Sequence, residues 1–188
     1  MKIRENSWLK NSLLTDLSYH SLVPIITAYI ALGSNLGDRP GHLRAAAAAI
    51  EKHPALKLIS QSRVYETAPV GGPAGQGAFL NAVLKLETEL TAGSLLELLL
   101  AIERSRGRER LTHWGPRTLD LDLLIYGDEI IREPGLTVPH PGLSHRAFVL
   151  APLSELAPEL VIPGLGTTVR EMLSKVDCTE VWATRLQF

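Results

Sequence analysis

Hydrophobic and polar positions follow two periods along the chain, and the changes between them mark the expected elements. Short apolar runs rich in β-branched residues, and runs in which apolar and polar residues alternate, are typical of strands. Four strands are predicted on this basis, over residues 25–32, 56–65, 79–90 and 119–126. Two helices are predicted between them, over residues 40–52 and from Thr91 or Ser94 to Arg106. The order of elements from residue 25 to residue 126 is therefore β-α-β-β-α-β.

This order is that of the split βαβ unit found in ferredoxin-like folds. We therefore predict an α/β (α+β) protein, a ferredoxin-like βαββαβ sandwich with additional C-terminal helices. Those helices are expected at 146–156 and after Thr167 or Thr168. The segment 130–143 is rich in proline and glycine and is read as irregular. A single domain is expected over residues 24–188, and residues 1–23 are expected to form a partly disordered N-terminal extension.

Composition and charge narrow the classes of function. The chain has 188 residues, the size of one domain, and a formal net charge of -1, so no basic excess indicates nucleic acid or an anionic membrane as a partner. No segment reaches the roughly 18 uninterrupted apolar residues of a membrane-spanning helix. The single cysteine, Cys178, excludes an intrachain disulfide and a zinc site built from cysteines, and it fits a reducing, cytoplasmic setting.

Two carboxylates, Asp120 and Asp122, lie two residues apart on the last predicted strand. Side chains alternate along a strand, so both share one face with Cα atoms about 6–7 Å apart, while the neighbouring leucines face the core. Carboxylates this close repel one another unless a cation lies between them. Oxygen ligands favour Mg²⁺, which also binds substrate phosphates. A bare Asp-x-Asp is more often an exposed strand face, so the surrounding residues have to decide.

Arginines surround the acidic pair, at Arg104, Arg106, Arg108, Arg110 and Arg117. Guanidinium groups stay charged and bind phosphate oxygens through paired hydrogen bonds. Beside metal-binding carboxylates they indicate a polyphosphate site, in which metal ions bridge oxygens and arginines neutralise charge. The alternative for Arg104 and Arg106 is that they only complement the negative end of their helix. Arg108 and Arg110 follow a glycine and could move as a lid.

Three other segments carry candidate binding residues. The turn 33–37 lies between a strand and a helix, where backbone amides can bind phosphate, or it is only a tight turn. It does not match the Walker A pattern, which excludes a P-loop kinase. His140 lies between two prolines and is followed by Arg146, a pair suited to phosphates, although a lone histidine is usually structural. Phe79 and Asn81 share a strand face that suits a flat heterocycle, but by themselves they favour a core phenylalanine and a surface asparagine.

Taken together, these motifs resemble a known family. The stretch Arg117-Thr-Leu-Asp-Leu-Asp, preceded by Trp114-Gly-Pro, closely resembles the signature of the 6-hydroxymethyl-7,8-dihydropterin pyrophosphokinases. Further matches are Gly33-Ser-Asn-Leu-Gly, Tyr65-Glu-Thr, Phe79-Leu-Asn, Val138-Pro-His and Arg146-Ala-Phe. The resemblance covers about residues 27–165, and it is specific because several motifs occur in order at matching separations.

The resemblance implies an enzyme of folate biosynthesis that transfers pyrophosphate from ATP to the hydroxymethyl group of 6-hydroxymethyl-7,8-dihydropterin and releases AMP. It implies two Mg²⁺ ions, bound by Asp120 and Asp122. The residues it assigns to ATP are Glu103, Arg117, His140 and Arg146. The residues it assigns to the pterin are Val70, Phe79, Asn81 and Phe148. It places Arg108, Arg110 and Trp114 on a mobile catalytic loop. No general base and no oligomeric state are predicted.

Two other classes of function remain open at this stage. One is an ATP-dependent phosphotransferase of the same fold that moves a single phosphoryl group and releases ADP. The other is a non-enzymatic ferredoxin-like module that binds a metabolite or metal and regulates a partner. The product formed from ATP distinguishes all three.

Overall fold

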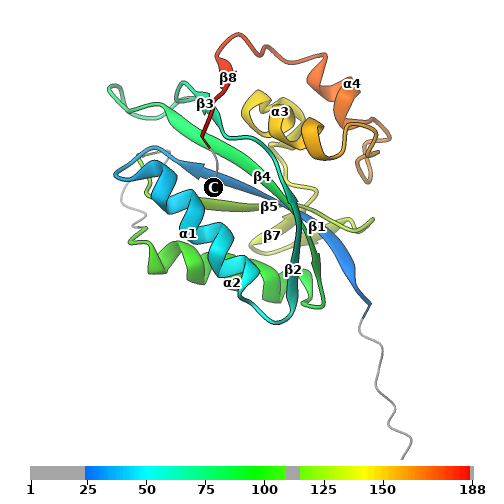
Figure 1. Cartoon of the computed structure of the whole chain (residues 1–188). Coiled ribbons are helices and arrows are strands. Elements are labelled where there is room, and N and C mark those ends of the chain that lie inside the picture. Colours follow the sequence, from blue (N-terminus) through cyan, green and yellow to red (C-terminus); the bar gives the residue numbers. More distant parts are fainter. Residues whose placement is uncertain (1–23, 109–114, 187–188) are drawn as a thin grey trace, which may run out of the picture.

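An antiparallel sheet of six strands runs through the middle of the structure, a computed structural model that describes residues 24–108 and 115–186 (Figure 1). The strands are β1 (Ile26–Ser34), β2 (Leu56–Gln61), β3 (Tyr65–Thr67), β4 (Phe79–Thr88), β5 (Asp120–Tyr126) and β8 (Val181–Ala183). Their order across the sheet is β5-β1-β4-β3-β8, and β2 pairs with β4 beyond the end of β3. The extension expected over residues 1–23 lies outside the described residues.

Helices cover both faces of this sheet. Helices α1 (Arg39–Glu51) and α2 (Ala92–Ser105) lie on one face, and α3 (Ala147–Leu156) and α4 (Val169–Leu173) lie on the other (Figure 1). The chain order through β5 and the strand order of the sheet are those of a ferredoxin-like unit, so the predicted fold class and its additional C-terminal helices are confirmed. None of the described helices has the length and apolar character needed to cross a membrane.

Local sequence determines where the helices begin. The carboxylate of Asp38 accepts a hydrogen bond from the amide of Gly41, and Pro40 lies in the first turn of α1. Thr91 caps α2 by accepting from the amide of Ser94, so of the two expected caps it is Thr91 that begins the helix. Thr168 and Glu171 form a reciprocal capping box at the start of α4.

The sheet is buried on both faces, which explains the nearly continuous apolar run of β1. One core lies between the sheet and the helices α1 and α2, and includes Ile30 and Leu99. The other lies between the sheet and the helices α3 and α4, and includes Tyr29 and Leu150. Because successive residues of β1 point to opposite faces, Tyr29 and Ile30 enter different cores. The site described below lies on the α3 face.

The single strand predicted over 56–65 is wrong, because Ser62 divides it into β2 and β3. The Ser62 hydroxyl accepts a hydrogen bond from the amide of Val83 at 2.9 Å, and the Ser62 amide donates to the carbonyl of Val83 at 2.9 Å. A side chain thus replaces one backbone group of the ladder, and the chain bends there. Ile59 adds a bulge to β2 just before this point.

The irregular segment predicted over 130–143 is also corrected. It contains a hairpin, β6 (Ile131–Glu133) paired with β7 (Leu136–Val138), followed by a short 3₁₀ helix, Leu143–His145. Strands of three residues are too short to show an alternating pattern in sequence. The same applies to β8, whose pairing with β3 closes the far edge of the sheet.

Glu155 of α3 binds the corner between β2 and β3. Its carboxylate accepts from the Arg63 amide at 2.9 Å, from the Arg63 guanidinium at 2.6 Å and from the Tyr65 hydroxyl at 2.6 Å. Burial would raise the pKa of Glu155, but these hydrogen bonds outweigh it and hold the pKa below its usual value. The ionised form therefore fixes α3 against the strands.

We expect Glu155→Gln to lower the free energy of unfolding at neutral pH by about 1–2 kcal/mol, because charged hydrogen bonds are lost. A carboxyl group with a lowered pKa stabilises the fold above its unfolded pKa, about 4.3, and this contribution disappears as pH falls through the folded pKa. Denaturant unfolding of both proteins across this range should show the difference shrinking in acid. Glu159→Gln, which breaks an exposed pair with Arg170, is the matched control and should change little. A Glu155→Gln deficit that is independent of pH would contradict this account.

Candidate active site

The floor of the site is a row of three residues on neighbouring strands. In the pairing register, Gly33 of β1 lies opposite Asn81 of β4 and opposite Asp120 of β5. Two residues earlier on the same face of β1, Ala31 lies opposite Asp122. Because β1 carries only glycine and alanine at these positions, the flanking side chains border a hollow instead of packing together. Gly33 belongs to the strand itself, so the turn predicted to start there begins after Ser34.

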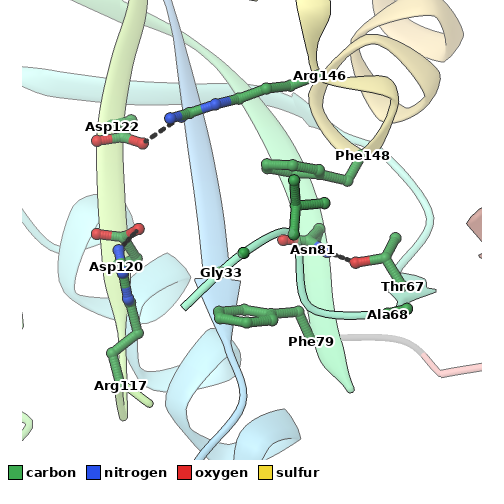
Figure 2. A pocket seen from close by; sticks show the side chains of 12 residues that line it. Gly33, Thr67, Ala68, Phe79, Asn81, Arg117, Asp120, Asp122, Arg146 and Phe148 are labelled. Atoms are coloured by element: carbon green, nitrogen blue, oxygen red, sulfur yellow. Dashed lines mark hydrogen bonds and ion pairs between the residues drawn. The ribbon is translucent and has the colours of Figure 1, made fainter. Parts of the chain in front are cut away.

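This hollow opens into a cavity of about 270 Å³. Its lining residues are Gly33, Thr67, Ala68, Val70, Gly71, Phe79, Asn81, Arg117, Asp120, Asp122, Arg146 and Phe148. Figure 2 shows the rings of Phe79 and Phe148 on either side of Asn81, the two aspartates on β5, Arg117 beside Asp120, and Arg146 reaching from the start of α3 toward Asp122. The cavity therefore joins an aromatic half and a charged half.

Asn81 is buried, contrary to the surface asparagine that the residues alone favoured. Its Nδ2 donates to the hydroxyl of Thr67 at 2.8 Å. A Cβ built on Gly33 would lie 3.4 Å from Asn81 Oδ1, which places this oxygen at the hollow over Gly33. The amide group is thus held with one polar edge engaged by the protein and the other at the cavity. Phe79, half-buried, lines the cavity and is not a core residue.

Four cationic or ionisable side chains surround the acidic pair. Asp120 lies 2.6 Å from Nη1 of Arg108 through one oxygen and 2.6 Å from Nη1 of Arg117 through the other. Asp122 lies 3.8 Å from Nη1 of Arg146 and 3.9 Å from Nε2 of His140. The sequence-predicted residues of the phosphate side are therefore brought together from four separate segments.

A bulge in β5 helps to place His140. The register between β1 and β5 shifts so that Leu124 has no partner on β1. The carbonyl of Leu124 accepts a hydrogen bond from the backbone amide of His140 at 2.9 Å. This bond ties the proline-flanked segment to the strand that carries Asp122.

The acidic pair lies in surroundings that shift the pKa of Asp122 and of the neighbouring His140. Burial raises the pKa of Asp122, and the nearby Asp120 raises it further. Burial lowers the pKa of His140, so this imidazole supplies little positive charge at neutral pH. The described part of the chain has no cluster of three or more His, Cys, Asp or Glu residues that could hold a metal. Two carboxylates on one face nevertheless fit Mg²⁺, which takes most of its other ligands from water and substrate phosphates.

Glu103, which the resemblance assigns to ATP, is a buried carboxylate. It is only 2% exposed, accepts the backbone amide of Leu121 at 2.7 Å and forms an ion pair with Arg108. It is not among the residues that line the cavity. In this arrangement Glu103 joins α2 to β5, between the two aspartates, and holds the Arg108 guanidinium near Asp120.

The remaining predicted residues lie at the margins. Val70 lines the rim of the cavity and is 74% exposed. Arg104 is exposed in the last turn of α2, and Arg106 lies 3.4 Å from Nδ1 of His42, so neither approaches the acidic pair in the way that Arg108 does. The predicted loop residues Arg110 and Trp114 fall in 109–114, outside the described residues.

Sequence reasoning missed Gly142 altogether. A Cβ at this position would lie 2.5 Å from Nε of Arg146, so the glycine leaves the space through which that side chain reaches Asp122. The guanidinium also lies over the ring of Phe148, 5.7 Å from its centroid. A glycine that follows the Pro-His-Pro segment was the available signal.

Comparison with known proteins tests the resemblance directly. Residues 29–158 match the model of the 7,8-dihydro-6-hydroxymethylpterin-pyrophosphokinase (HPPK) family. The chain belongs to this family. A curated HPPK-type relative, the 2-amino-4-hydroxy-6-hydroxymethyldihydropteridine pyrophosphokinase of Haemophilus influenzae, is 49% identical over 139 residues, 74% of this chain and 86% of the relative. The corresponding protein of Methylorubrum extorquens is 44% identical over 150 residues, 80% of this chain and 93% of the relative.

Solved structures support the fold. The HPPK-DHPS wild type of Plasmodium falciparum matches with a TM-score of 0.62 and 16% sequence identity. The match covers 81% of this chain and 44% of that chain, which is much longer. The resemblance found in the sequence is thus confirmed, and the chain is an ATP-dependent pyrophosphokinase of folate biosynthesis.

The hollow over Gly33 is open to a direct test, because a Cβ there would lie 3.4 Å from Asn81 Oδ1 and 3.7 Å from the Cβ of Asp120. We expect Gly33→Ala to fold normally and to raise the KM for the pterin, since the added methyl group occupies the floor of the cavity. Gly93→Ala on α2, where a Cβ meets nothing within 4 Å, is the matched control. Unchanged steady-state kinetics of Gly33→Ala would contradict this description of the floor.

The space beside Gly142 gives a second test. Its backbone is in the ordinary right-handed region (φ -84°), so Gly142→Ala adds no backbone strain, but the new methyl group overlaps the Arg146 side chain. We expect this variant and Arg146→Ala to show the same direction of loss in kcat/KM for ATP, with thermal unfolding little changed. If Gly142→Ala retains full activity while Arg146→Ala does not, Gly142 is not what gives Arg146 its position.

Proposed function

We propose that this chain transfers the pyrophosphoryl group of ATP to the hydroxymethyl oxygen of 6-hydroxymethyl-7,8-dihydropterin within this cavity, and that AMP leaves. One observation carries the proposal: a single cavity joins an aromatic slot, formed by Phe79 and Phe148 around the buried amide of Asn81, to two carboxylates and two guanidinium groups. A flat heterocycle and a polyphosphate can therefore lie side by side, with the acceptor hydroxyl directed toward the phosphates.

The aromatic half binds the pterin. Its ring lies against Phe79 and Phe148, and Asn81 Oδ1 accepts from the amide or amino edge of the heterocycle. Thr67 supports this assignment because its hydroxyl accepts a hydrogen bond from Nδ2 of Asn81, an arrangement that leaves Oδ1 toward the cavity. Val70 is proposed to cover the outer edge of the ring from the rim.

The charged half binds the nucleotide. Asp120 and Asp122 are the residues proposed to hold two Mg²⁺ ions, which when bound with ATP neutralise phosphate charge and polarise the transferred group. Arg117 and Arg146 both line the cavity and contact these carboxylates, so the same guanidinium groups are placed to bind phosphate oxygens. Burial lowers the pKa of His140, so its neutral imidazole donates a hydrogen bond to a phosphate through Nε2.

Positioning and charge neutralisation supply the acceleration in this proposal. Arg108, held by the buried Glu103, stabilises charge that develops on the phosphate as the leaving AMP separates. Glu103 therefore acts through Arg108 and β5, not by contact with the nucleotide. Arg110 and Trp114 keep their proposed place on the catalytic loop, and no side chain is assigned as a general base. The reducing, cytoplasmic setting inferred from the single cysteine belongs to the same proposal.

Product analysis tests the proposed reaction. Phosphorus NMR of the chain with ATP, Mg²⁺ and 6-hydroxymethyl-7,8-dihydropterin should show AMP and a pterin pyrophosphate. ADP in place of AMP would indicate transfer of a single phosphoryl group, and unchanged ATP in a folded sample would indicate a binding module.

The metal-binding role of the acidic pair is tested in the same assay. Asp122→Asn keeps the shape of the side chain but removes the charge that holds Mg²⁺, so we expect AMP formation to be abolished. Asp128→Asn, in the exposed turn after β5, is the matched control and should react normally. AMP release from Asp122→Asn at the wild-type rate would overturn the two-metal assignment.

A further inference from the structure

We propose that Asn35 and Gln76 are positioning residues. They tie the glycine-rich loop of residues 70–77, which forms one wall of the cavity, to the backbone of Arg117. They form a relay of hydrogen bonds from this wall, beside the pterin, to the segment just before β5, the strand that carries Asp120 and Asp122. The inference rests on the proposed function for the identity of the two ligands. The relay itself rests on contacts that hold whatever the ligand is.

The wall has no hydrophobic anchor of its own. Residues 70–75 are all exposed, and Gly71, Gly72 and Gly75 have positive φ values of 75°, 81° and 81°. Glycine adopts this backbone conformation freely, but it also leaves the loop with much conformational entropy to lose. Gly71 nevertheless lines the cavity, so hydrogen bonds have to hold the segment in place.

Gln76 stabilises the loop through hydrogen bonds of its side-chain amide. It is the one half-buried residue among the described positions 70–77. Its Nε2 donates to the carbonyl of Gly71 at 3.3 Å, which closes the loop on itself. Its Oε1 accepts from Nδ2 of Asn35 at 3.2 Å. The same Nδ2 donates to the carbonyl of Gly77 at 3.3 Å, so Asn35 grips the loop at two neighbouring residues.

Asn35 binds the backbone of Arg117 through its Oδ1 and its own backbone amide. Its Oδ1 accepts from the amide of Arg117 at 2.8 Å, and its backbone amide donates to the carbonyl of Arg117 at 3.1 Å. The neighbouring Ser34 hydroxyl donates to the carbonyl of Thr118 at 2.5 Å. Asn35 is only 7% exposed, so its polar atoms depend on these partners. Serine lacks the reach for both sides, and aspartate lacks the donor.

The chain of contacts runs from Gly71 through Gln76 and Asn35 to Arg117. Gly71 and Arg117 line the same cavity: Gly71 follows Val70, which is assigned to the pterin, and Arg117 lies beside the carboxylate of Asp120. Loss of Gln76 should therefore disturb the pterin side alone. Loss of Asn35 should disturb both sides, because it also frees the backbone of Arg117.

Steady-state kinetics of the full chain test this division. Removing a neutral hydrogen bond should raise the pterin KM of Gln76→Met about three- to tenfold, with kcat and the ATP KM unchanged. Asn35→Ala should raise the pterin KM to a similar extent and also lower kcat. In the double variant the pterin KM should equal that of Asn35→Ala alone, since both changes break one relay. Gln61→Met, the same substitution on the exposed end of β2, is the matched control.

Hydrogen exchange of residues 71–77 gives a readout that does not depend on turnover. Both Gln76→Met and Asn35→Ala should exchange faster here than the wild type, with the helices unaffected. Wild-type pterin KM and wild-type exchange in Gln76→Met would overturn the relay, and this variant decides the matter even if Asn35→Ala does not fold. An unchanged kcat in folded Asn35→Ala would overturn the link to Arg117. A wild-type enzyme that forms no AMP refutes the proposed function, whereas the exchange measurement still tests the relay.

Discussion

Two negative charges on one face of an edge strand are the constraint around which this molecule is arranged. Asp120 and Asp122 share the face of β5 that is covered by α3, where burial and the charge of Asp120 raise the pKa of Asp122. The compensating guanidinium groups are those of Arg108 after α2, Arg117 before β5 and Arg146 before α3. Arg146 comes from a different part of the chain than Arg108 and Arg117, so all three reach the pair only when α3 has packed against the sheet.

The same face also has to stay partly empty, which conflicts with the close packing that stabilises a sheet. The conflict is resolved by position along β1. Toward its start, Tyr29 fills the core under α3, whereas Ala31 and Gly33 near its end carry almost no side chain. Stability is thus concentrated at one end of the strand and the binding hollow at the other. The second core, between the sheet and α1 and α2, is continuous beneath both ends.

Sequence patterns predicted those elements whose stability is local. The β-branched run of β1, the alternation of β4 and the capped helices follow from period and propensity, and the paired aspartates follow from alternation along β5. The misses depend on contacts between distant residues. Ser62 interrupts a strand because its hydroxyl meets Val83, and Asn81 is buried because Thr67 accepts its amide. No local pattern carries such information, so the resemblance of ordered motifs was a better guide to Asn81 than its own surroundings.

The last strand of the sheet, β8, shows that the fold of this protein extends beyond the segment shared with the family. Strand β8 covers the open edge of β3, and Thr67 of β3 in turn orients Asn81, yet β8 lies beyond residues 29–158 that the family shares. An uncovered strand edge is a template for pairing with other molecules. A chain cut at the family boundary would keep every proposed catalytic side chain, but it would expose that edge and lose Ile162, Val169 and Met172 from the core under α3. The segment that carries the proposed catalytic side chains and the segment that keeps the sheet covered therefore have different boundaries.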